Sequence, residues 1–247
     1  HMRAATEPQI SVTEQADRAL IAVQGPEAGA VIAGMDSCAA AMSFMDVTDL
    51  TVDGIAVWAS RSGYTGEDGF EISVQSSQAE QLVSALLAYE TVAPIGLGAR
   101  NSLRLEAGLC LYGNDISGGT TPVEAALLWG IQKVRRPGGA RAGGYPGAAV
   151  IAQQIDTGAA RKRVGLLPEG RAPMREGVDL FDAATGGHLI GQVTSGSFGP
   201  SVDGPVAMGY VTAPHAAVGT AIWGEVRGKR LPVAVSALPF VAANFKR

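Results

Sequence analysis

The chain has 247 residues, of which 47% are hydrophobic and 17% charged, and its formal net charge is −4 at pH 7. This composition excludes a disordered chain and leaves room for two domains with a buried core. The small negative charge gives no reason to expect nucleic acid or an acidic membrane as a partner. No apolar run approaches the length that spans a bilayer, so we expect a soluble protein.

Cysteine and histidine are too sparse for a disulfide framework or a zinc site. The cysteines are Cys38 and Cys110, and no spacing among cysteines and histidines matches a set of metal ligands. We therefore expect no bound metal and a reducing, intracellular location. Cys110 lies in an apolar run, which predicts a buried thiol.

The first third of the chain predicts a small sheet with helices. Residues 3–18 are polar and predict a frayed lead-in, whereas 19–23, 55–60 and 70–74 predict strands and 27–32 predicts a helix. The three glycines in 63–69 predict a tight turn between strands. A phosphate-binding loop is the weaker alternative, because the lysine of a P-loop is absent. Ser77 and Glu80 form a predicted capping box for the next helix.

The stretch 96–136 gathers most of the residues that are able to do chemistry. Glu106 lies in a largely apolar run, where a carboxylate is costly unless hydrogen bonds compensate for its burial. Arg135 and Arg136 follow, and an arginine pair suits an anionic ligand. Two interpretations stay open, a ligand site or a helix whose Glu106 pairs with a nearby arginine for stability. Alternating leucines fit a strand, but we favour a helix over 102–108 with Asn101 as its N-cap.

The remainder of the chain changes from helical to strand-like patterning. Thr121 to Glu124 joins a capping box to a proline and predicts a helix start, and 146–154 predicts a short helix after a glycine-rich loop at 138–144. Short apolar runs separated by turn residues then predict an antiparallel barrel or sandwich. Its predicted strands are 163–167, 178–181, 189–194, 206–211, 220–226 and 231–236.

Four separated motifs, in one order, resemble the glycine cleavage system T protein family. They are GYTGEDGFEI at 63–72, NSLRLEAGLCLYGND at 101–115 with TTPVEA at 120–125, VTSG at 193–196, and AMGYV at 207–211. The resemblance runs from about Ala19 to the C-terminus. It implies an α+β fold, in which partial mixed α/β folate-binding domains precede a C-terminal antiparallel β-barrel.

The resemblance also implies a division into three parts. These are a remnant of the family's second domain at 1–65, the later half of its discontinuous folate-binding domain at 66–157, and the barrel at 158–247. Family members carry a long segment before the equivalent of Ala19, including an aspartate that assists the chemistry. The resemblance therefore implies an N-terminally truncated chain that is weakly active alone, marginally stable and prone to self-association. If the assisting group lies within this chain, Asp115 and Asp68 are the first candidates.

The activity that the resemblance implies is tetrahydrofolate-dependent aminomethyl transfer. Lipoylated H protein is the expected partner, tetrahydrofolate accepts the one-carbon unit, and ammonia is released, in the cytoplasm or in the mitochondrial matrix of a eukaryote. By the same resemblance, Glu106 and Arg135 match folate-binding positions. Phe245 falls where the family has a tyrosine, so one hydroxyl is lost there. No catalytic residue is assigned.

Two alternatives and one docking surface complete the predictions. A folate-dependent demethylase with the same fold shares parts of the motifs, and a non-catalytic folate-binding or interaction module is a third possibility. The H protein is expected to be acidic, so a basic group of this chain is a candidate docking surface. The groups are Lys133 with Arg135 and Arg136, Arg161 to Arg163, and Arg227 to Arg230.

Overall fold

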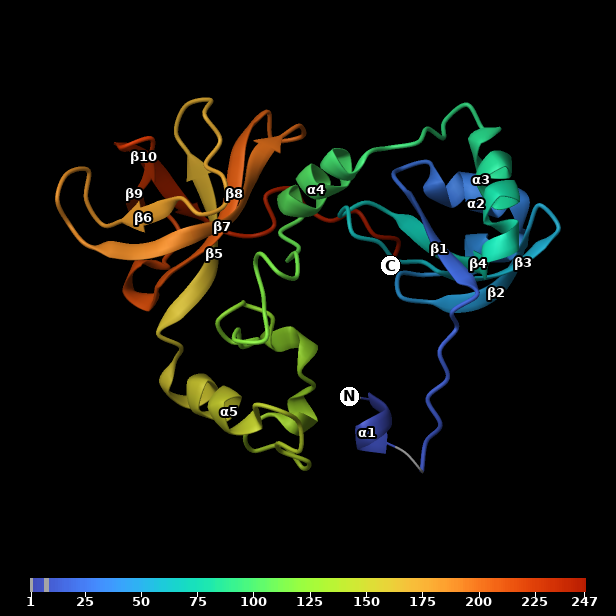
Figure 1. Cartoon of the computed structure of the whole chain (residues 1–247), viewed down its shortest axis with the longest axis horizontal. Helices are drawn as coiled ribbons and strands as arrows, with labels where there is room; N and C mark the ends of the chain where they lie inside the picture. Colours follow the sequence, from blue (N-terminus) through green and yellow to red (C-terminus); the bar gives the residue numbers. More distant parts are fainter. Residues whose placement is uncertain (1, 7–8) are drawn as a thin grey trace. The chain divides into compact units, whose positions relative to one another are not determined.

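The computed structural model describes residues 2–6 and 9–247, and the chain forms two compact units (Figure 1). Unit 1 contains the described residues up to Gly63, then Glu67–Ile95 and the C-terminal Asn244–Arg247. Unit 2 contains Tyr64–Gly66 and Gly96–Ala243. The three-part division at 65 and 157 stays a prediction.

Unit 1 is built on an antiparallel four-stranded sheet in the order β1-β4-β3-β2. The strands are β1 Arg18–Gln24, β2 Val47–Val52, β3 Ile55–Ser60 and β4 Gly69–Gln75. The helical elements are α1 Met2–Thr6, α2 Ala28–Met35, η1 Ser37–Ala41, η2 Ser76–Gln78 and α3 Ala79–Leu87. The predictions for 19–23, 27–32, 55–60 and 70–74 are confirmed as β1, α2, β3 and β4.

The core of unit 1 forms because apolar residues alternate along the strands and recur along the helices. In β3 the side chains of Ile55, Val57 and Ala59 are buried, and they pack in one cluster with Val31 and Leu82 of α2 and α3. The alternate residues of each strand face away from this core, because successive strand side chains point to opposite faces. One face of the sheet is therefore covered by α2 and α3 (Figure 1).

Two glycines of the motif at 63–72 leave room for the side chain of Gln24 beside the sheet of unit 1. The Gln24 amide donates from Nε2 to the carbonyl oxygen of Ser62 at 3.0 Å and to that of Phe70 at 3.3 Å. A Cβ on Gly63 would lie 1.7 Å from Gln24 Oε1, and one on Gly69 would lie 2.5 Å from Gln24 Nε2. These glycines are thus required by the close approach of the Gln24 side chain, whereas the predicted tight turn was wrong, because residues 61–68 form a longer connection between β3 and β4.

Several local predictions were wrong, and each for a physical reason. α3 begins after a 3-10 turn with Gln78 at its N-cap and no side-chain cap bond, so Ser77 caps nothing. Asn101 lies inside α4 (Leu97–Glu106), whose N-cap is Gly96, because the helix begins a full turn earlier than predicted. In the predicted frayed lead-in, the described residues include helix α1, and residues 7–8 lie outside the description.

The predicted capping box at Thr121 forms without a helix. Thr121 N donates to Glu124 Oε2 at 3.2 Å and Glu124 N donates to Thr121 Oγ1 at 3.1 Å, which is the reciprocal pattern. The chain leaves the helical conformation at Ala126, where φ is +57°. The motif therefore stabilises a single turn.

Unit 2 combines short helices with a closed barrel. Besides α4 it has η3 Leu128–Gly130, η4 Lys133–Arg135 and α5 Ala148–Thr157. The barrel order is β10-β5-β8-β7-β6-β9, all antiparallel, and its interior includes Leu166, Leu180 and Ile222. All six predicted strands are confirmed, as β5 Arg161–Pro168, β6 Asp179–Phe181, β7 Leu189–Gly199, β8 Gly204–Thr212, β9 Ala221–Val226 and β10 Lys229–Ser236.

A buried ion pair holds the loop after α2 in unit 1. Arg61 is 4% exposed, and its Nε lies 3.0 Å from Asp68 Oδ1 while its Nη2 lies 2.5 Å from Asp68 Oδ2. Arg61 Nη1 also donates to the carbonyl oxygens of Ala39 and Met42, at 3.2 and 3.0 Å. The hydrogen bonds from Arg61 lower the pKa of Asp68 below its ordinary value, despite partial burial of the carboxyl.

We expect Asp68→Asn to lower the free energy of unfolding by about 3 kcal/mol at pH 7, because it leaves a buried guanidinium without its anion. The folded-state pKa of Asp68 is depressed, so its contribution is present above the unfolded pKa, near about 4, and is lost as the pH falls through the folded value. Urea unfolding at pH 7 and pH 3 measures both effects. Exposed Asp53→Asn is the matched control, and equal stability of the two variants at pH 7 contradicts the prediction.

Candidate functional site

The carboxylate of Glu106 lies at the end of α4 and is bound by the turn between β7 and β8. Glu106 is 2% exposed. Its Oε1 accepts hydrogen bonds from Ser201 N at 2.7 Å and Val202 N at 3.0 Å, and its Oε2 accepts one from Ser201 Oγ at 3.0 Å. Three donors on two oxygens compensate for burial of the charge. The expectation of a compensated carboxylate is confirmed, but the alternative partner, a nearby arginine, was wrong.

Backbone geometry brings the barrel close to Glu106. A Cβ on Gly199 would lie 2.8 Å from Glu106 Oε1, so only glycine leaves room for the carboxylate at this position of β7. The carbonyl oxygen of Glu106 accepts hydrogen bonds from Phe240 N at 2.9 Å and Val241 N at 3.1 Å. The side chain of Glu106 therefore joins α4 to the β7–β8 turn of the barrel, and its main chain joins α4 to the segment after β10.

A second buried cluster centres on Asp115, whose side chain is 0% exposed. Arg104 Nη1 lies 2.6 Å from Asp115 Oδ2, and Leu111 N donates to the same oxygen at 2.8 Å. Two hydroxyls of β7 also donate to this carboxylate, Ser195 Oγ to Oδ2 at 2.9 Å and Thr194 Oγ1 to Oδ1 at 2.5 Å. Asp115 therefore accepts hydrogen bonds from four donors, and all four belong to unit 2.

The remaining donors of Arg104 tie the same cluster to α4 and β7. Arg104 is 2% exposed, and its Nε donates to Asn101 Oδ1 at 2.8 Å. Its Nη2 donates to Ser195 Oγ at 2.8 Å, and its Nη1 donates to the carbonyl oxygen of Leu109 at 3.1 Å. Asn101 therefore has a structural partner, because its amide oxygen accepts a hydrogen bond from Arg104 Nε.

Arg163 is a buried cation of unit 2, and the groups to which it donates hydrogen bonds are uncharged. It is 7% exposed, and it donates to the carbonyl oxygens of Ala125 at 2.9 Å and Gly108 at 3.0 Å and contacts the Met208 sulfur at 2.9 Å. Its charge lowers the pKa of the Cys110 thiol, but burial outweighs it and the pKa is raised. Cys110 is thus a protonated thiol at neutral pH, half-buried where the sequence predicted full burial.

The two arginines after η3 differ in how many donors are occupied. Arg136 donates from Nε to the carbonyl oxygen of Ile131 and from Nη2 to that of Leu128, both at 2.8 Å. Arg135 uses only Nη1, which donates to the carbonyl oxygens of Gly143 at 3.2 Å and Arg141 at 3.4 Å. Within the described residues, the Nε and Nη2 of Arg135 have no hydrogen-bond partner. Arg135 is the better placed of the two to bind an anion.

Phe245, the third residue assigned by resemblance, belongs to unit 1. Its ring stacks on Phe44 with centroids 4.1 Å apart and an interplanar angle of 12°. Asn244 forms a parallel bridge with Glu67, and Phe44 N donates to the carbonyl oxygen of Lys246 at 2.6 Å. The three assigned residues therefore have separate contacts in the part of the chain that the structure describes. Sequence reasoning missed Ser195 and Ser201, although Ser195 lies in the VTSG motif.

Across residues 2–6 and 9–247, no group of three or more His, Cys, Asp or Glu side chains is arranged to hold a metal ion. The same residues contain no helix that is both long and apolar enough to cross a membrane.

We expect Asp115→Asn to destabilise unit 2 by about 3–5 kcal/mol, because it leaves Arg104 buried without a counter-charge. Thermal unfolding followed by circular dichroism measures the loss. Asp179→Asn, in the barrel but on its surface, is the control for removing one negative charge. A stability equal to that of the control would show that the cluster does not hold the unit together.

Comparison with known proteins gives two family matches along the chain. Residues 1–135 match the GCVT N-terminal domain, and residues 161–242 match the glycine cleavage T-protein C-terminal barrel domain. The second match covers the closed barrel described above, β5 to β10.

Two similar proteins are named as mitochondrial aminomethyltransferases. The mitochondrial aminomethyltransferase of Dictyostelium discoideum is 43% identical over 240 residues, which is 94% of this chain and 58% of the relative. That of Homo sapiens is 46% identical over 234 residues, 94% of this chain and 56% of the relative. The chain therefore spans somewhat more than half the length of these relatives.

A solved structure has the same fold. The glycine cleavage system aminomethyltransferase T from Bartonella henselae is 46% identical, with a TM-score of 0.85 over 93% of this chain and 61% of that one. This match confirms the predicted α+β class with a C-terminal barrel. Together with the matches to both family domains, it shows that the chain belongs to the glycine cleavage T-protein family.

Proposed function

We propose that this chain carries out, or contributes to, aminomethyl transfer from lipoylated H protein to tetrahydrofolate, with release of ammonia. The main support is its identity of 43% and 46% with two named aminomethyltransferases over 94% of the chain. In such a reaction tetrahydrofolate supplies the acceptor chemistry, and the protein's contribution is to bind and orient it. The names of those relatives also favour a mitochondrial location in a eukaryote.

Arg135 is our first proposed contact for the folate. The free Nε and Nη2 edge of its guanidinium matches the geometry of a carboxylate, such as the glutamyl tail of a folate. Gly143 and Gly144, with φ of +72° and +74°, let the backbone wrap closely around Nη1. The loop thereby fixes one side of the guanidinium and leaves the other side for a ligand.

Glu106 is our second proposed contact, and the geometry adds a requirement to this proposal. The residue is 2% exposed and its oxygens accept three hydrogen bonds from the β7–β8 turn. A pterin ring reaches this carboxylate only if that turn opens. The proposal therefore predicts that ligand binding and the turn at Ser201 compete for the same acceptors.

We propose that an acidic H protein docks on basic side chains that are exposed and make no structural contacts. Arg163 is buried, and Arg230 lies over the Phe181 ring at 3.4 Å and donates to the carbonyl oxygen of Ala183 at 2.8 Å. Lys133 and Arg141 are exposed, and so are Lys162, Arg227 and Lys229, so each of the three basic groups keeps an exposed side chain for docking.

Paired variants separate ligand binding by Arg135 from structural support by its neighbour. We expect Arg135→Met to weaken the binding of 5-methyltetrahydrofolate about tenfold, because a charge-assisted hydrogen bond is lost. Arg136→Met removes the same charge and breaks two carbonyl contacts of 2.8 Å, shorter than the 3.2 and 3.4 Å contacts of Arg135, so it should lower the melting temperature more and the affinity less. Isothermal calorimetry measures the affinities. Equal affinities for the two variants contradict the assignment of Arg135.

Glu106→Gln tests both roles of that carboxylate. We expect a loss of about 1.5–3 kcal/mol in the free energy of unfolding, because a buried amide replaces the acceptor of three hydrogen bonds. If Glu106 also binds folate, the affinity measured at a temperature where the variant is fully folded falls as well. Unchanged affinity in the folded variant removes Glu106 from the folate site and leaves it as a structural residue.

The proposed activity is tested directly with the purified chain. Methylenetetrahydrofolate formation is followed with aminomethyl-loaded lipoyl H protein as donor, and dimethylglycine serves as the alternative donor. Product from the H protein alone supports the aminomethyltransferase. Turnover of dimethylglycine, with none from H protein, replaces it with the demethylase.

A further inference from the structure

The face of the unit 1 sheet opposite α2 and α3 exposes large apolar side chains. Leu20, Trp58 and Asp49 lie in one row across this face, because Leu20 and Trp58 both pair with Ser73 and Asp49 pairs with Trp58. Leu20 is 69% exposed and Trp58 is 47% exposed. An exposed tryptophan at the middle of a sheet face is typical of a protein interaction site rather than of a solvated surface.

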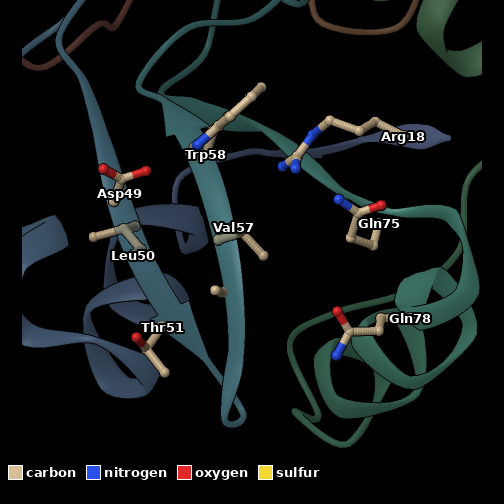
Figure 2. Close-up of a pocket in the computed structure, with 9 residues that line it drawn as sticks. Arg18, Asp49, Leu50, Thr51, Val57, Trp58, Gln75 and Gln78 are labelled. Carbon is tan, nitrogen blue, oxygen red and sulfur yellow. The ribbon is translucent and has the colours of Figure 1, made fainter. Parts of the chain in front are cut away.

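A hollow of about 330 Å³ opens on this face beside Trp58 (Figure 2). Its shape follows from the size of Ala56, which lies two residues before Trp58 in β3 and opposite Thr51 of β2. The small methyl group of Ala56 leaves space between the larger side chains around it. The lining residues are Arg18, Asp49, Leu50, Thr51, Ala56, Val57, Trp58, Gln75 and Gln78.

Arg18 lies on one face of the Trp58 ring, and Trp58 remains 47% exposed. The Arg18 guanidinium carbon lies 3.8 Å from the ring centroid, and Arg18 is fixed there because Nε and Nη2 donate to Ser73 Oγ and Ser73 O at 2.8 and 2.7 Å. Figure 2 shows Trp58 between Arg18 and Asp49. Among the described residues the Asp49 carboxylate has no hydrogen-bond or ion-pair partner. An aromatic face next to an unpaired carboxylate attracts a cation.

The charge around the hollow indicates the charge of the partner that this face attracts. Arg18 lines the hollow and is already held on the Trp58 ring, whereas residues 19–60 contain no Lys, Arg or His and contain Glu27, Asp36, Asp46, Asp49 and Asp53. Asp46, Asp49 and Asp53 are exposed along and beside the edge strand β2. This charge repels nucleic acid and anionic membranes and is complementary to a basic polypeptide.

The backbone at the edge of β2 is partly occupied, which favours docking through side chains over the addition of a strand. Asp36 Oδ2 accepts a hydrogen bond from Thr51 N at 2.7 Å, so this outward backbone donor of the edge strand is occupied. A partner that added a strand here would have to displace Asp36. The hollow and its carboxylate remain accessible without that cost.

We propose that this face of unit 1 binds a basic segment of a partner polypeptide, with one arginine or lysine side chain entering the hollow between Trp58 and Asp49. Further basic residues of the segment lie opposite Asp46 and Asp53. The partner of this face differs in charge from the acidic H protein and from folate, so the proposal does not depend on the proposed activity.

The test uses the whole chain and a fluorescein-labelled peptide of alternating alanine and arginine, followed by fluorescence anisotropy. We expect saturable binding that weakens about threefold in Asp49→Asn and about threefold in Trp58→Ala. Asp156→Asn, an exposed aspartate of α5, removes the same charge elsewhere and should leave the affinity unchanged. Trp58→Phe keeps an aromatic face and should retain most of the binding.

Each other outcome overturns the proposal. No binding of the peptide shows that this face does not take a basic segment, and equal losses in Asp49→Asn and Asp156→Asn show that only net charge acts. Tighter binding of a matched alanine–glutamate peptide reverses the charge assignment. Melting curves identify a variant that fails to fold, and in that case the Trp58→Phe and Asp49→Asn pair decides the question.

Discussion

The buried ion pair between Arg104 and Asp115 is the constraint on which the arrangement of unit 2 depends. A carboxylate without exposure to water is tolerated only when its acceptor positions are filled, and removal of any one donor leaves a costly charge. The donors here come from α4, from the loop that follows it and from β7. The helix, the loop and the barrel must therefore adopt one relative position, and Glu106 fixes that position again through the β7–β8 turn.

The barrel could be predicted from the sequence because its strands are separated by turn residues and each carries enough apolar side chains. β2 was missed since its residues are mostly exposed: Val47, Thr48 and Asp49 all face solvent, and only Leu50 and Val52 reach the core. The available signal was the Asp53-Gly54 pair, whose φ values of +51° and +75° fit a two-residue hairpin. Residues 47–52 form a strand because they pair with β3, and the local propensity of a sequence does not include such pairing.

The candidate site was predictable only as far as the identity of its charged residues. A glutamate in an apolar run indicates that hydrogen-bond donors must compensate for its burial. The backbone donors to Glu106 are those of Ser201 and Val202, which lie 95 and 96 positions further along the chain. Such pairings depend on barrel register, which no local pattern specifies. The same holds for Ser195 and Arg104, 91 positions apart. By contrast, the reciprocal bonds of Thr121 and Glu124 are local and were predicted, although the helix expected to follow them was not formed.

The distribution of charge separates two kinds of surface within this chain. In unit 1, residues 19–60 hold carboxylates and no cation, while in unit 2 residues 125–155 hold Lys133, Arg135, Arg136 and Arg141 and no carboxylate. Arg135 and Arg136 are held by carbonyl oxygens, which orient a guanidinium without cancelling its charge. The unit 1 surface therefore keeps a negative electrostatic potential and the unit 2 surface a positive one. Screening by salt limits the range of each potential to about 8–10 Å. We therefore expect the proposed anionic ligand to prefer the loop of unit 2 and the proposed basic partner to prefer the β2 face of unit 1.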